Sequence, residues 1–448
     1  MPDREPGLFE GRGDAGRRPD ERMESVRGSM SEGAKFEGTG AAGPEAGAAG
    51  TPFAVAVVGA GAAGLAAALA VAREGIPTAL VGRHAPVADG RTVALLDGSV
   101  RFLGALGAWA AVAPQASPLC ELQIVDDTGS LFRPPPARFR AAEIGLDAFG
   151  WNVESARLVE SLRACARAQD NLTLVEADAA RAVPGETAAC IALADGGAVE
   201  ARLVVGADGA HSPLRAASGV RVRSWAYPQS AITTILAHER PHRDVSTEFH
   251  TRSGPFTLVP LPGGHRSSLV WVTGEGAARR LAALDDAALA QAVERQARAM
   301  LGAMRVDGPR GLVPMRGLAV ATPVAPRLAL IGEAAHVFPP IGAQGLNLGL
   351  RDAATLRDAV LAATRDRRDP GSRPVLDGYA RSRRIDTAAR TAAVDLLNRS
   401  LLTDLLPVDA LRGFGLLAMT QLGPLRRLVM REGVLPRIGA PGLMRAAR

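Results

Sequence analysis

The stretch FAVAVVGAGAAGLAAALAVAREGIPTALVG, residues 53–82, decides the fold. Its first six residues are apolar and rich in valine, which predicts a buried strand. The glycine-rich turn GAGAAG (59–64) follows, and the alanine-rich segment after it predicts a helix that ends at Gly75. The residues IPTALVG (76–82) predict a second strand. Together these elements form a βαβ unit, so we expect an α/β protein built on a parallel sheet.

The turn has the GxGxxG spacing of a dinucleotide-binding site. Gly59 would permit the tight turn, Gly61 would let a pyrophosphate reach the backbone, and Gly64 would let the helix pack closely on the strand. The helix then begins at Ala62 and Ala63, where free N–H groups and the positive end of the helix dipole suit phosphates. Small residues also serve plain helix–sheet packing, so a structural role is the alternative.

One feature departs from this pattern. An acidic residue usually follows the second strand of such a unit and binds a ribose hydroxyl. Here the strand ends at Gly82 and Arg83 follows. We therefore expect the ribose contact to come from elsewhere, or Arg83 to contact the adenosine end of the ligand.

Two later segments repeat the change from strand to turn. In LVVGADGAHSPLR (203–215), Asp208 and Gly209 follow an apolar run, although Asp-Gly is also common in ordinary turns. In RLALIGEAAHVFPPIGAQGLNLGL (327–350), Glu333 follows a third run, and a glycine-rich turn precedes a helix. Ligands of open α/β sheets bind at the carboxyl ends of the strands, so we expect these segments to meet at one site.

Between these segments the pattern changes. Residues 228–275 read as short strands separated by turns, which predicts an antiparallel sheet. His238 and His242 match the zinc-protease spacing HExxH. Pro241 lies inside the motif, however, and disfavours the helix that would put both histidines on one face. We therefore interpret this segment as a turn at the end of a strand and expect no metal site.

The composition narrows the function classes further. A hydrophobic content of 47% in 448 residues can fill the cores of two or three domains. The net charge of +6 comes mostly from arginine, since Lys35 is the only lysine, and no dense basic run with interleaved aromatic residues suggests nucleic-acid binding. Cys120, Cys165 and Cys190 are far apart and form no CxxC pair, which favours a reducing cytoplasm.

The three motifs GxGxxG, GADG and GEAAH…GxQGxN, in this order, resemble those of the group A FAD-dependent aromatic monooxygenases. These enzymes have the para-hydroxybenzoate hydroxylase-like fold. The resemblance covers about residues 52–440. Within the family, the chain looks most like the ubiquinone-biosynthesis hydroxylases of the UbiH/UbiF/Coq6 branch. It implies a Rossmann-like FAD-binding domain with an inserted antiparallel-sheet substrate domain and a helical C-terminus.

The resemblance also assigns roles to residues. Arg91 matches an arginine near the FAD phosphates, and Glu333 stands where the family usually has Asp, one methylene shorter. The backbone N–H groups of Leu346 and Asn347 would face the pyrimidine edge of the flavin, and Pro340 would stiffen the wall between flavin and substrate. His336 is expected to be structural. The expected cofactor-binding residues are Gly59, Gly61, Ala62, Ala63, Gly64, Arg83, Arg91, Asn152, Arg157, Asp208, Gly209, Gly332, Glu333, Gly342, Gln344, Gly345, Leu346 and Asn347.

The resemblance implies that NAD(P)H reduces FAD, that O2 adds to give a flavin C4a-hydroperoxide, and that an electron-rich ring is hydroxylated. The substrate would be a polyprenylated phenol of ubiquinone biosynthesis, held against the antiparallel sheet. Three alternatives stay open: a hydroxylase of a soluble aromatic, an isoprenoid reductase of the same fold, and a non-catalytic assembly protein of a quinone-synthesis complex.

Partners and location follow from the C-terminus. From residue 410 onward the chain is apolar with seven arginines and one acidic residue, Glu432, which suits an anionic membrane surface, a packed helix or a partner protein equally. We expect a cytoplasmic protein, with peripheral attachment to the inner membrane as an option. The expected segments are a disordered tail (1–50), an FAD-binding domain in two parts (51–225 and 318–385), the substrate domain (226–317) and a helical C-terminal region (386–448).

Overall fold

The βαβ unit forms as the sequence predicts. Strands β1 (Phe53–Val58) and β2 (Thr78–Val81) pair in parallel, and α1 (Ala62–Ala72) crosses between them. Alternate residues of β1 face opposite sides, since Val55 and Val57 pack among the helices while Ala56 and Val58 pack on the other face. Burial of both faces explains why this strand is a continuous apolar run.

The computed structural model describes residues 52–84, 90–129, 135–339, 344–401, 421–434 and 440–445. Residues 47–448 form one compact unit by their contacts. The predicted tail, residues 1–50, lies outside the described residues, and so do Pro340 and Gly342. The finer division into an FAD-binding domain and a substrate domain stays a prediction.

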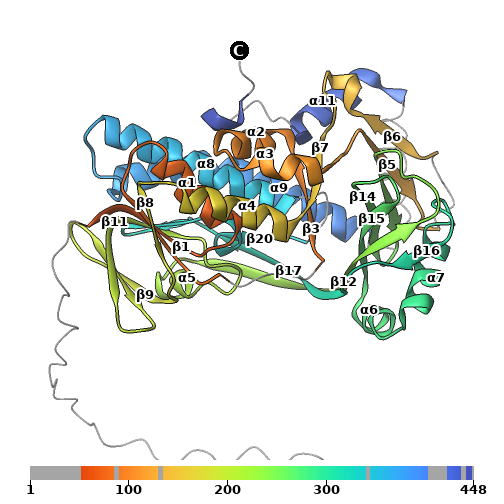
Figure 1. Cartoon of the computed structure of the whole chain (residues 1–448), viewed down its shortest axis with the longest axis horizontal. Helices are drawn as coiled ribbons and strands as arrows, with labels where there is room; N and C mark the ends of the chain where they lie inside the picture. The colour runs from red at the N-terminus through yellow and green to blue at the C-terminus, as the bar shows by residue number, and fades with distance from the viewer. Residues whose placement is uncertain are drawn as a thin grey trace, which may run out of the picture. The chain divides into compact units, whose positions relative to one another are not determined.

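The first sheet has eight strands, and its central order is β18-β19-β11-β1-β2-β8. The strands from β19 to β8 are parallel, whereas β18 and the β9–β10 hairpin pair antiparallel. Helices cover one face and the hairpin lies on the other (Figure 1). The further strands are β8 (Leu172–Val175), β9 (Ala179–Pro184), β10 (Ala189–Leu193), β11 (Ala198–Gly206), β18 (Val324–Ala325) and β19 (Leu328–Leu330).

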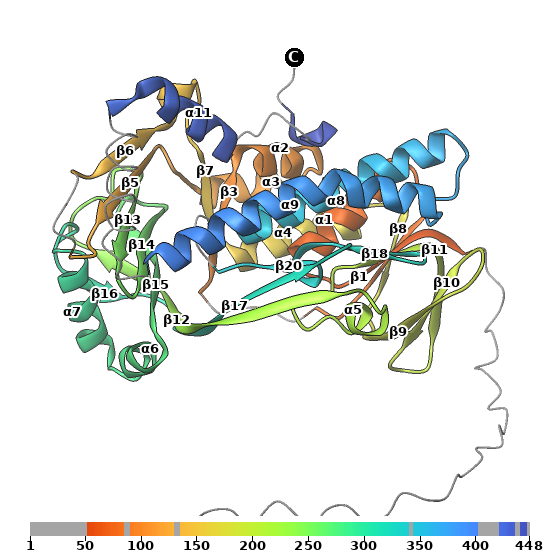
Figure 2. The same cartoon turned by 180° about the vertical axis from the view of Figure 1, so that it is seen from behind.

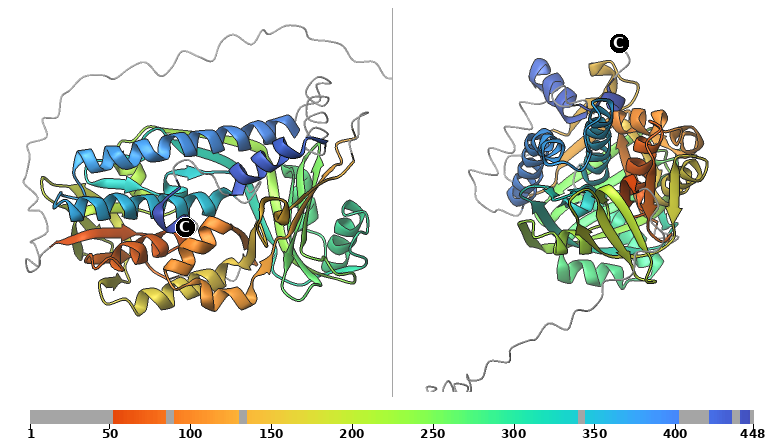
Figure 3. Two further views of the ribbon diagram at one scale, coloured as in Figure 1. Left: turned by 90° about the horizontal axis from the view of Figure 1, so that it is seen from above. Right: turned by 90° about the vertical axis from the view of Figure 1, so that its left-hand side faces the viewer.

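The helical layer is built around α1. It packs against α4 (Ser155–Arg167) and α8 (Gln344–Arg365), and α8 in turn packs against α9 (Arg373–Leu401). The helices α8 and α9 run side by side, and α9 extends towards the second sheet (Figures 2 and 3). Alanine and leucine dominate these contacts, as the low aromatic content of 4% requires.

The second sheet has nine strands in the order β20-β17-β12-β15-β14-β13-β5-β6, with β16 on β12. All neighbours are antiparallel except β5 and β13. This confirms the antiparallel sheet predicted for residues 228–275. The sheet also contains β5 and β6, which come from the chain before residue 226. The strands are β5 (Glu121–Asp126), β6 (Ala137–Arg140), β12 (Val222–His238), β13 (Val245–Thr251), β14 (Gly254–Leu261), β15 (Arg266–Gly274), β16 (Met304–Val306), β17 (Gly311–Val320) and β20 (His336–Val337).

A three-stranded sheet, β3-β7-β4, and short helices complete the described part. Helices α6 and α7 follow β15. The strands are β3 (Thr92–Leu96), β4 (Ser117–Pro118) and β7 (Gly150–Glu154). The helices are α2 (Asp97–Ala105), α3 (Trp109–Val112), α5 (Pro213–Ala217), α6 (Glu275–Ala282), α7 (Asp286–Gln296) and α11 (Gly423–Val434), with 3-10 turns η1 (Ala113–Gln115), η2 (Ala141–Ile144), η3 (Gly332–Ala334) and η4 (Gly442–Met444).

The HExxH segment is a turn at a strand end, as expected. His238 closes β12, and its ring nitrogens lie 2.7 Å from the Arg240 carbonyl oxygen and 3.0 Å from Ser267 Oγ. His242 Nε2 lies 2.8 Å from the Leu261 carbonyl oxygen. These hydrogen bonds tie the imidazole rings of His238 and His242 to the neighbouring strands and turns. Separately, none of the helices described is both long and apolar enough to cross a membrane.

Candidate active site

The three strand ends singled out in the sequence lie side by side. In the first sheet β1 neighbours β11, and β11 neighbours β19, all in parallel. Val58 pairs with Gly206, and Gly206 pairs with Leu330. The turns after these strands therefore open at the same edge of the sheet, which confirms the predicted meeting point.

Backbones in these turns approach so closely that only glycine fits. A Cβ on Gly59 would lie 2.2 Å from the carbonyl oxygen of Ala207, and one on Gly64 would lie 1.9 Å from that of Gly59. Gly59 also has φ +118°, which side chains rarely adopt. The first turn, the segment before Asp208 and α1 are thus locked together by direct backbone contact.

The N-terminus of α1 is open towards this edge. Its N-cap, Gly61, has extended backbone and no capping side chain, and the first turn holds no acidic residue. A Cβ on Gly61 would meet no atom within 4 Å. The N–H groups of the first helical turn, which includes Ala62 and Ala63, therefore lack the side-chain cap that usually satisfies them, and the site suits an anionic pyrophosphate.

Asp208 carries a buried atom without a partner. Its Oδ2 accepts a hydrogen bond of 3.1 Å from the Leu214 amide, but its Oδ1 is buried and has no hydrogen-bond partner among the described residues. A buried acceptor left unpaired costs about 1–3 kcal/mol. The atom is therefore suited to accept from a ligand hydroxyl, such as those of the ribityl or ribose groups of FAD.

Arg215 holds two of the turns together. Its Nη1 donates to the Ala334 carbonyl oxygen (3.0 Å) and its Nη2 to that of Ala210 (2.7 Å). Ser212 caps α5 by accepting from the Arg215 amide at 2.9 Å, which fixes where this helix begins. Sequence reasoning missed Arg215, although an arginine seven residues after Asp208, in the helix that follows the turn, was a usable signal.

The third turn places Gly332 and Glu333 at the site. Gly332 has φ +58°, and a Cβ on Gly349 of α8 would lie 3.2 Å from its Cα. The Glu333 side chain is exposed, as a group that awaits a ligand hydroxyl would be. Gln344, Gly345 and Leu346 follow in the first turn of α8.

Asn347 serves the fold through its side chain. Its Oδ1 accepts from the Leu96 amide (2.9 Å), and its Nδ2 donates to the Ala94 carbonyl oxygen (2.8 Å). The side chain is buried, so it ties the start of α8 to β3. The flavin contact expected of its backbone N–H stays a prediction.

We expect Asn347→Leu to weaken the protein at this junction. Leucine would leave both half-buried backbone groups of β3 without their side-chain partner, at a cost of about 1 kcal/mol each. Urea unfolding should show a lower midpoint, and the purified variant should hold less flavin. An exposed change on the same helix, Arg365→Leu, should leave both quantities unchanged.

The remaining predicted contacts lie in different surroundings. Arg83 forms an exposed ion pair with Asp178 at 3.0 Å. Asn152 is buried and donates to the Pro260 carbonyl oxygen at 2.9 Å, so its side chain joins β7 to β14. Arg157 pairs with Glu154 at 3.7 Å. The Arg91 carbonyl accepts from Ser155 at 2.9 Å, just before α4. Their roles towards a cofactor stay predictions.

A buried ionic network supports the third turn. Asp352 of α8 accepts from the Gly332 amide (3.0 Å) and from Arg383 Nε (2.7 Å), and it lies 2.6 Å from His336 Nε2. Burial alone would raise the pKa of Asp352, but the charges of His336 and Arg383, with the bonds from His336 and Gly332, lower it below its usual value. The carboxylate is therefore ionised, and His336 Nε2 donates to it. The structural role expected for His336 is consistent with this network.

A parallel sheet with an open helix N-terminus, an unpaired carboxylate oxygen and a glycine-rich third turn is typical of a dinucleotide-binding protein. The family described as FAD binding domain matches residues 52–393. Ubiquinone hydroxylase UbiL of Rhodospirillum rubrum is 34% identical over 408 residues, which cover 88% of this chain and 92% of that protein. The chain thus belongs to the family of FAD-dependent monooxygenases.

Two further proteins are similar to the chain. The 3-demethoxyubiquinol 3-hydroxylase of Escherichia coli is 30% identical over 397 residues, covering 85% of this chain and 98% of that protein. The crystal structure of p-nitrophenol 4-monooxygenase PnpA from Pseudomonas putida has a TM-score of 0.71 at 18% identity, covering 86% and 99% of the two chains. This second likeness concerns the fold, and it confirms the predicted fold class.

Proposed function

We propose that this FAD-dependent monooxygenase hydroxylates a polyprenylated phenol of ubiquinone biosynthesis, with NAD(P)H as reductant and O2 as cosubstrate. One observation carries the proposal: the three predicted turns meet at one sheet edge with an open helix N-terminus and an unpaired Asp208 oxygen. The two hydroxylases described above, named for ubiquinone and demethoxyubiquinol, support this choice of substrate.

Bound FAD would supply the oxygen-transfer chemistry. The residues of the chain bind and orient the reactants. The N-terminus of α1 would hold the pyrophosphate, Asp208 Oδ1 would accept from a cofactor hydroxyl, and Arg215 keeps the second and third turns in register. The roles expected of Pro340 as the flavin–substrate wall and of Gly342 as a cofactor contact stay predictions, because both residues lie outside the described residues.

The second sheet carries a buried apolar cluster, and we propose that the substrate lies beside it. Ala231, Val272 and Met315 are buried together, and Tyr227 and Val270 pack against them. This cluster lies on β12, β15 and β17, within or next to the predicted substrate segment. An aromatic ring held there would be shielded from water, which protects the oxygen-transfer step from side reactions.

The test is to identify the bound flavin and then to compare substrates. Purified protein should carry FAD, and a prenylated phenol should accelerate NAD(P)H oxidation and appear as a hydroxylated product. The same phenol without its prenyl chain should react far less. If the unprenylated phenol reacts equally well, the enzyme is a hydroxylase of soluble aromatics, and if reconstitution yields no bound FAD, the assembly-protein alternative replaces the enzyme.

We further propose that α11 docks on an anionic membrane surface. Its inner side is fixed, because Met430 packs with Phe149 and Ile144, and Arg426 pairs with Glu143. Its outer side exposes an apolar strip with two basic neighbours, a combination that suits interfacial binding. The strip and its neighbours are Leu422, Leu425, Leu428, Val429, Arg427 and Arg431.

We expect Leu428→Ser to weaken binding to vesicles. Leu428 is 58% exposed, so the change should leave the fold intact while removing apolar area from the docking face. Cosedimentation with vesicles of anionic phospholipid should fall several-fold. Val183→Ser is the control, since Val183 is 49% exposed on β9, far along the chain from α11. Equal binding by both variants would exclude α11 as the docking helix.

A further inference from the structure

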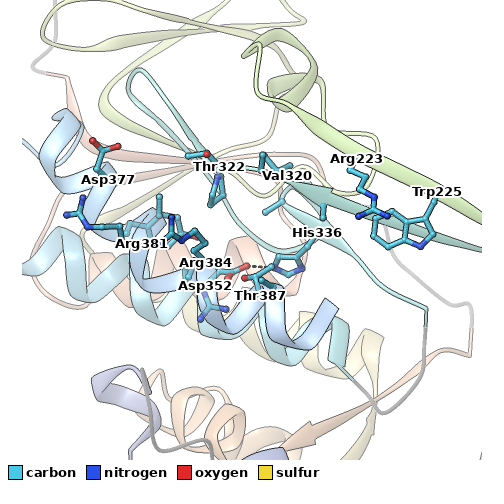
Figure 4. Close-up of a pocket in the computed structure, with 18 residues that line it drawn as sticks. Arg223, Trp225, Val320, Thr322, His336, Asp352, Asp377, Arg381, Arg384 and Thr387 are labelled. Atoms are coloured by element: carbon cyan, nitrogen blue, oxygen red, sulfur yellow. Dashed lines mark hydrogen bonds and ion pairs between the residues drawn. The ribbon is translucent and has the colours of Figure 1, made fainter. Parts of the chain in front are cut away.

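A cavity of about 560 Å³ lies beside the predicted flavin site, between α9 and the strands β12 and β17. Figure 4 shows Arg381 and Arg384 entering from α9 and Arg223 and Trp225 from β12. The cofactor-binding turns described above do not line it, apart from Ala335 and His336 just beyond η3. No role assigned so far uses this space.

One wall of the cavity is apolar and rigid. The small side chains of Ala319, Val320 and Pro323 form it from β17 and the following turn, opposite Ala380 of α9. A cavity lined in this way and large enough for a small organic molecule suits an apolar group.

An aromatic side chain closes one end. The Trp225 indole lies flat on β17, where a Cβ on Gly317 would come within 2.1 Å of it, and its Nε1 donates to the Tyr227 hydroxyl at 2.6 Å. The guanidinium carbon of Arg223 lies 5.4 Å from the centre of this ring, within range of a cation–π contact. The ring and the cation are thus held in place before any ligand arrives.

The charges around the cavity do not balance. Asp352 is neutralised by Arg383, and Asp377 pairs with Arg373 at 2.8 Å. By contrast, three arginines of the lining have no carboxylate partner within the described part of the chain. They are Arg223, Arg381 and Arg384.

Two buried polar atoms of the lining residues add a second indication. Arg383 is 2% exposed and His336 is 3% exposed, and both residues line the cavity. Arg383 Nη2 and His336 Nδ1 have no hydrogen-bond partner among the described residues. An arginine nitrogen is always a donor, so at least one buried donor here is left for a ligand or for water.

We propose that this cavity binds an elongated amphipathic molecule that ends in a carboxylate or a phosphate. The apolar wall and Trp225 would hold its chain, and Arg381 and Arg384 would hold its head group. A small inorganic anion would leave the apolar volume unfilled, and a neutral lipid would leave the arginines without a partner. The inference does not depend on the hydroxylation proposed above, because it concerns a different set of residues.

Binding calorimetry on the purified full-length protein tests the proposal with three probes below their micelle concentrations: decanoate, decyl phosphate and decanol. We expect one-to-one binding of decanoate or decyl phosphate, with a dissociation constant at least about tenfold lower than that of decanol. A tenfold difference is what one charge-assisted hydrogen bond to the head group would add. The tighter of the two anions identifies the head group. Equal binding of decanol, or no binding of either anion, would overturn the proposal.

Variants locate the binding. The double variant Arg381→Gln, Arg384→Gln should weaken anion binding at least about tenfold. Glutamine can still form hydrogen bonds, but it lacks the positive charge that strengthens those bonds to an anion. Both side chains are exposed, so the double variant should fold. Arg280→Gln on α6 is the matched control, because Arg280 is also an exposed helical arginine with no ion pair in the described structure. If the double variant binds the anion as the control does, the site lies elsewhere.

Discussion

Replacing Asp352 with Asn should lower the free energy of unfolding by about 3–5 kcal/mol, the range for breaking one side of a buried ion pair. Asp352 and Arg383 are each 2% exposed, and the carboxylate also binds His336 and the Gly332 amide. Asparagine has nearly the same shape but no charge, and its amide nitrogen cannot accept from these donors. Among the described residues, Asp386 at 2.7 Å would then be the one carboxylate still paired with Arg383.

Urea unfolding measures this loss, with Asp377→Asn as the control. Asp377 pairs with the exposed Arg373 on the same helix, so its change should cost less than about 1 kcal/mol. The pH dependence has a definite sign. Because folding lowers the pKa of Asp352, its contribution is complete above the unfolded value of about 3.9 and is lost as pH falls through the folded value. The difference between wild type and Asp352→Asn should therefore be constant above about pH 5 and should shrink only in stronger acid. A difference that grows on acidification would contradict this assignment.

The sequence predicted the parts of the site that depend on local backbone. The GxGxxG turn at Gly59, the strand end at Asp208 and the turn at Gly332 each follow an apolar run, and parallel topology then brings them to one edge. Glycines at this spacing indicate places where backbones approach closely, so the positions of these turns could be predicted without a structure.

Other parts depend on contacts that are distant along the chain. Nothing local shows that β5 pairs with β13, since both are short strands that mix polar and apolar residues and lie more than a hundred residues apart in the chain. Asp352 and Arg383 looked like ordinary charges on amphipathic helices, and only the packing of α8 against α9 buries them together. The cofactor contacts expected of Asn152 and Asn347 stay predictions, and nothing local shows that their side chains also bond to backbone groups of other strands. Hydrogen bonds of this kind leave no periodic signal.

Gly61→Val should abolish most flavin binding while leaving the fold intact. Gly61 has ordinary extended backbone, and a Cβ there meets no protein atom within 4 Å, so valine fits the protein without strain. The same side chain would occupy the space through which a pyrophosphate reaches the first turn of α1. We expect FAD affinity to fall about a hundredfold, equivalent to ~2.8 kcal/mol. Flavin content of the purified protein and titration of the apoprotein with FAD both measure it.

Gly274→Val separates this effect from a general penalty for valine at a helix start. Gly274 is the N-cap of α6, also has no capping side chain, and a Cβ there would likewise meet no atom within 4 Å. Both variants should lose a similar, small amount of stability, of the order of 1 kcal/mol. Only Gly61→Val should lose flavin, because the N-terminus of α1, unlike that of α6, follows a strand that ends at the shared edge of β1, β11 and β19. If Gly61→Val keeps its flavin, the pyrophosphate does not bind at this helix, and the placement of the cofactor along the three turns is wrong. If both variants lose it, the loss reflects the fold, and the site must be tested instead through the unpaired oxygen of Asp208.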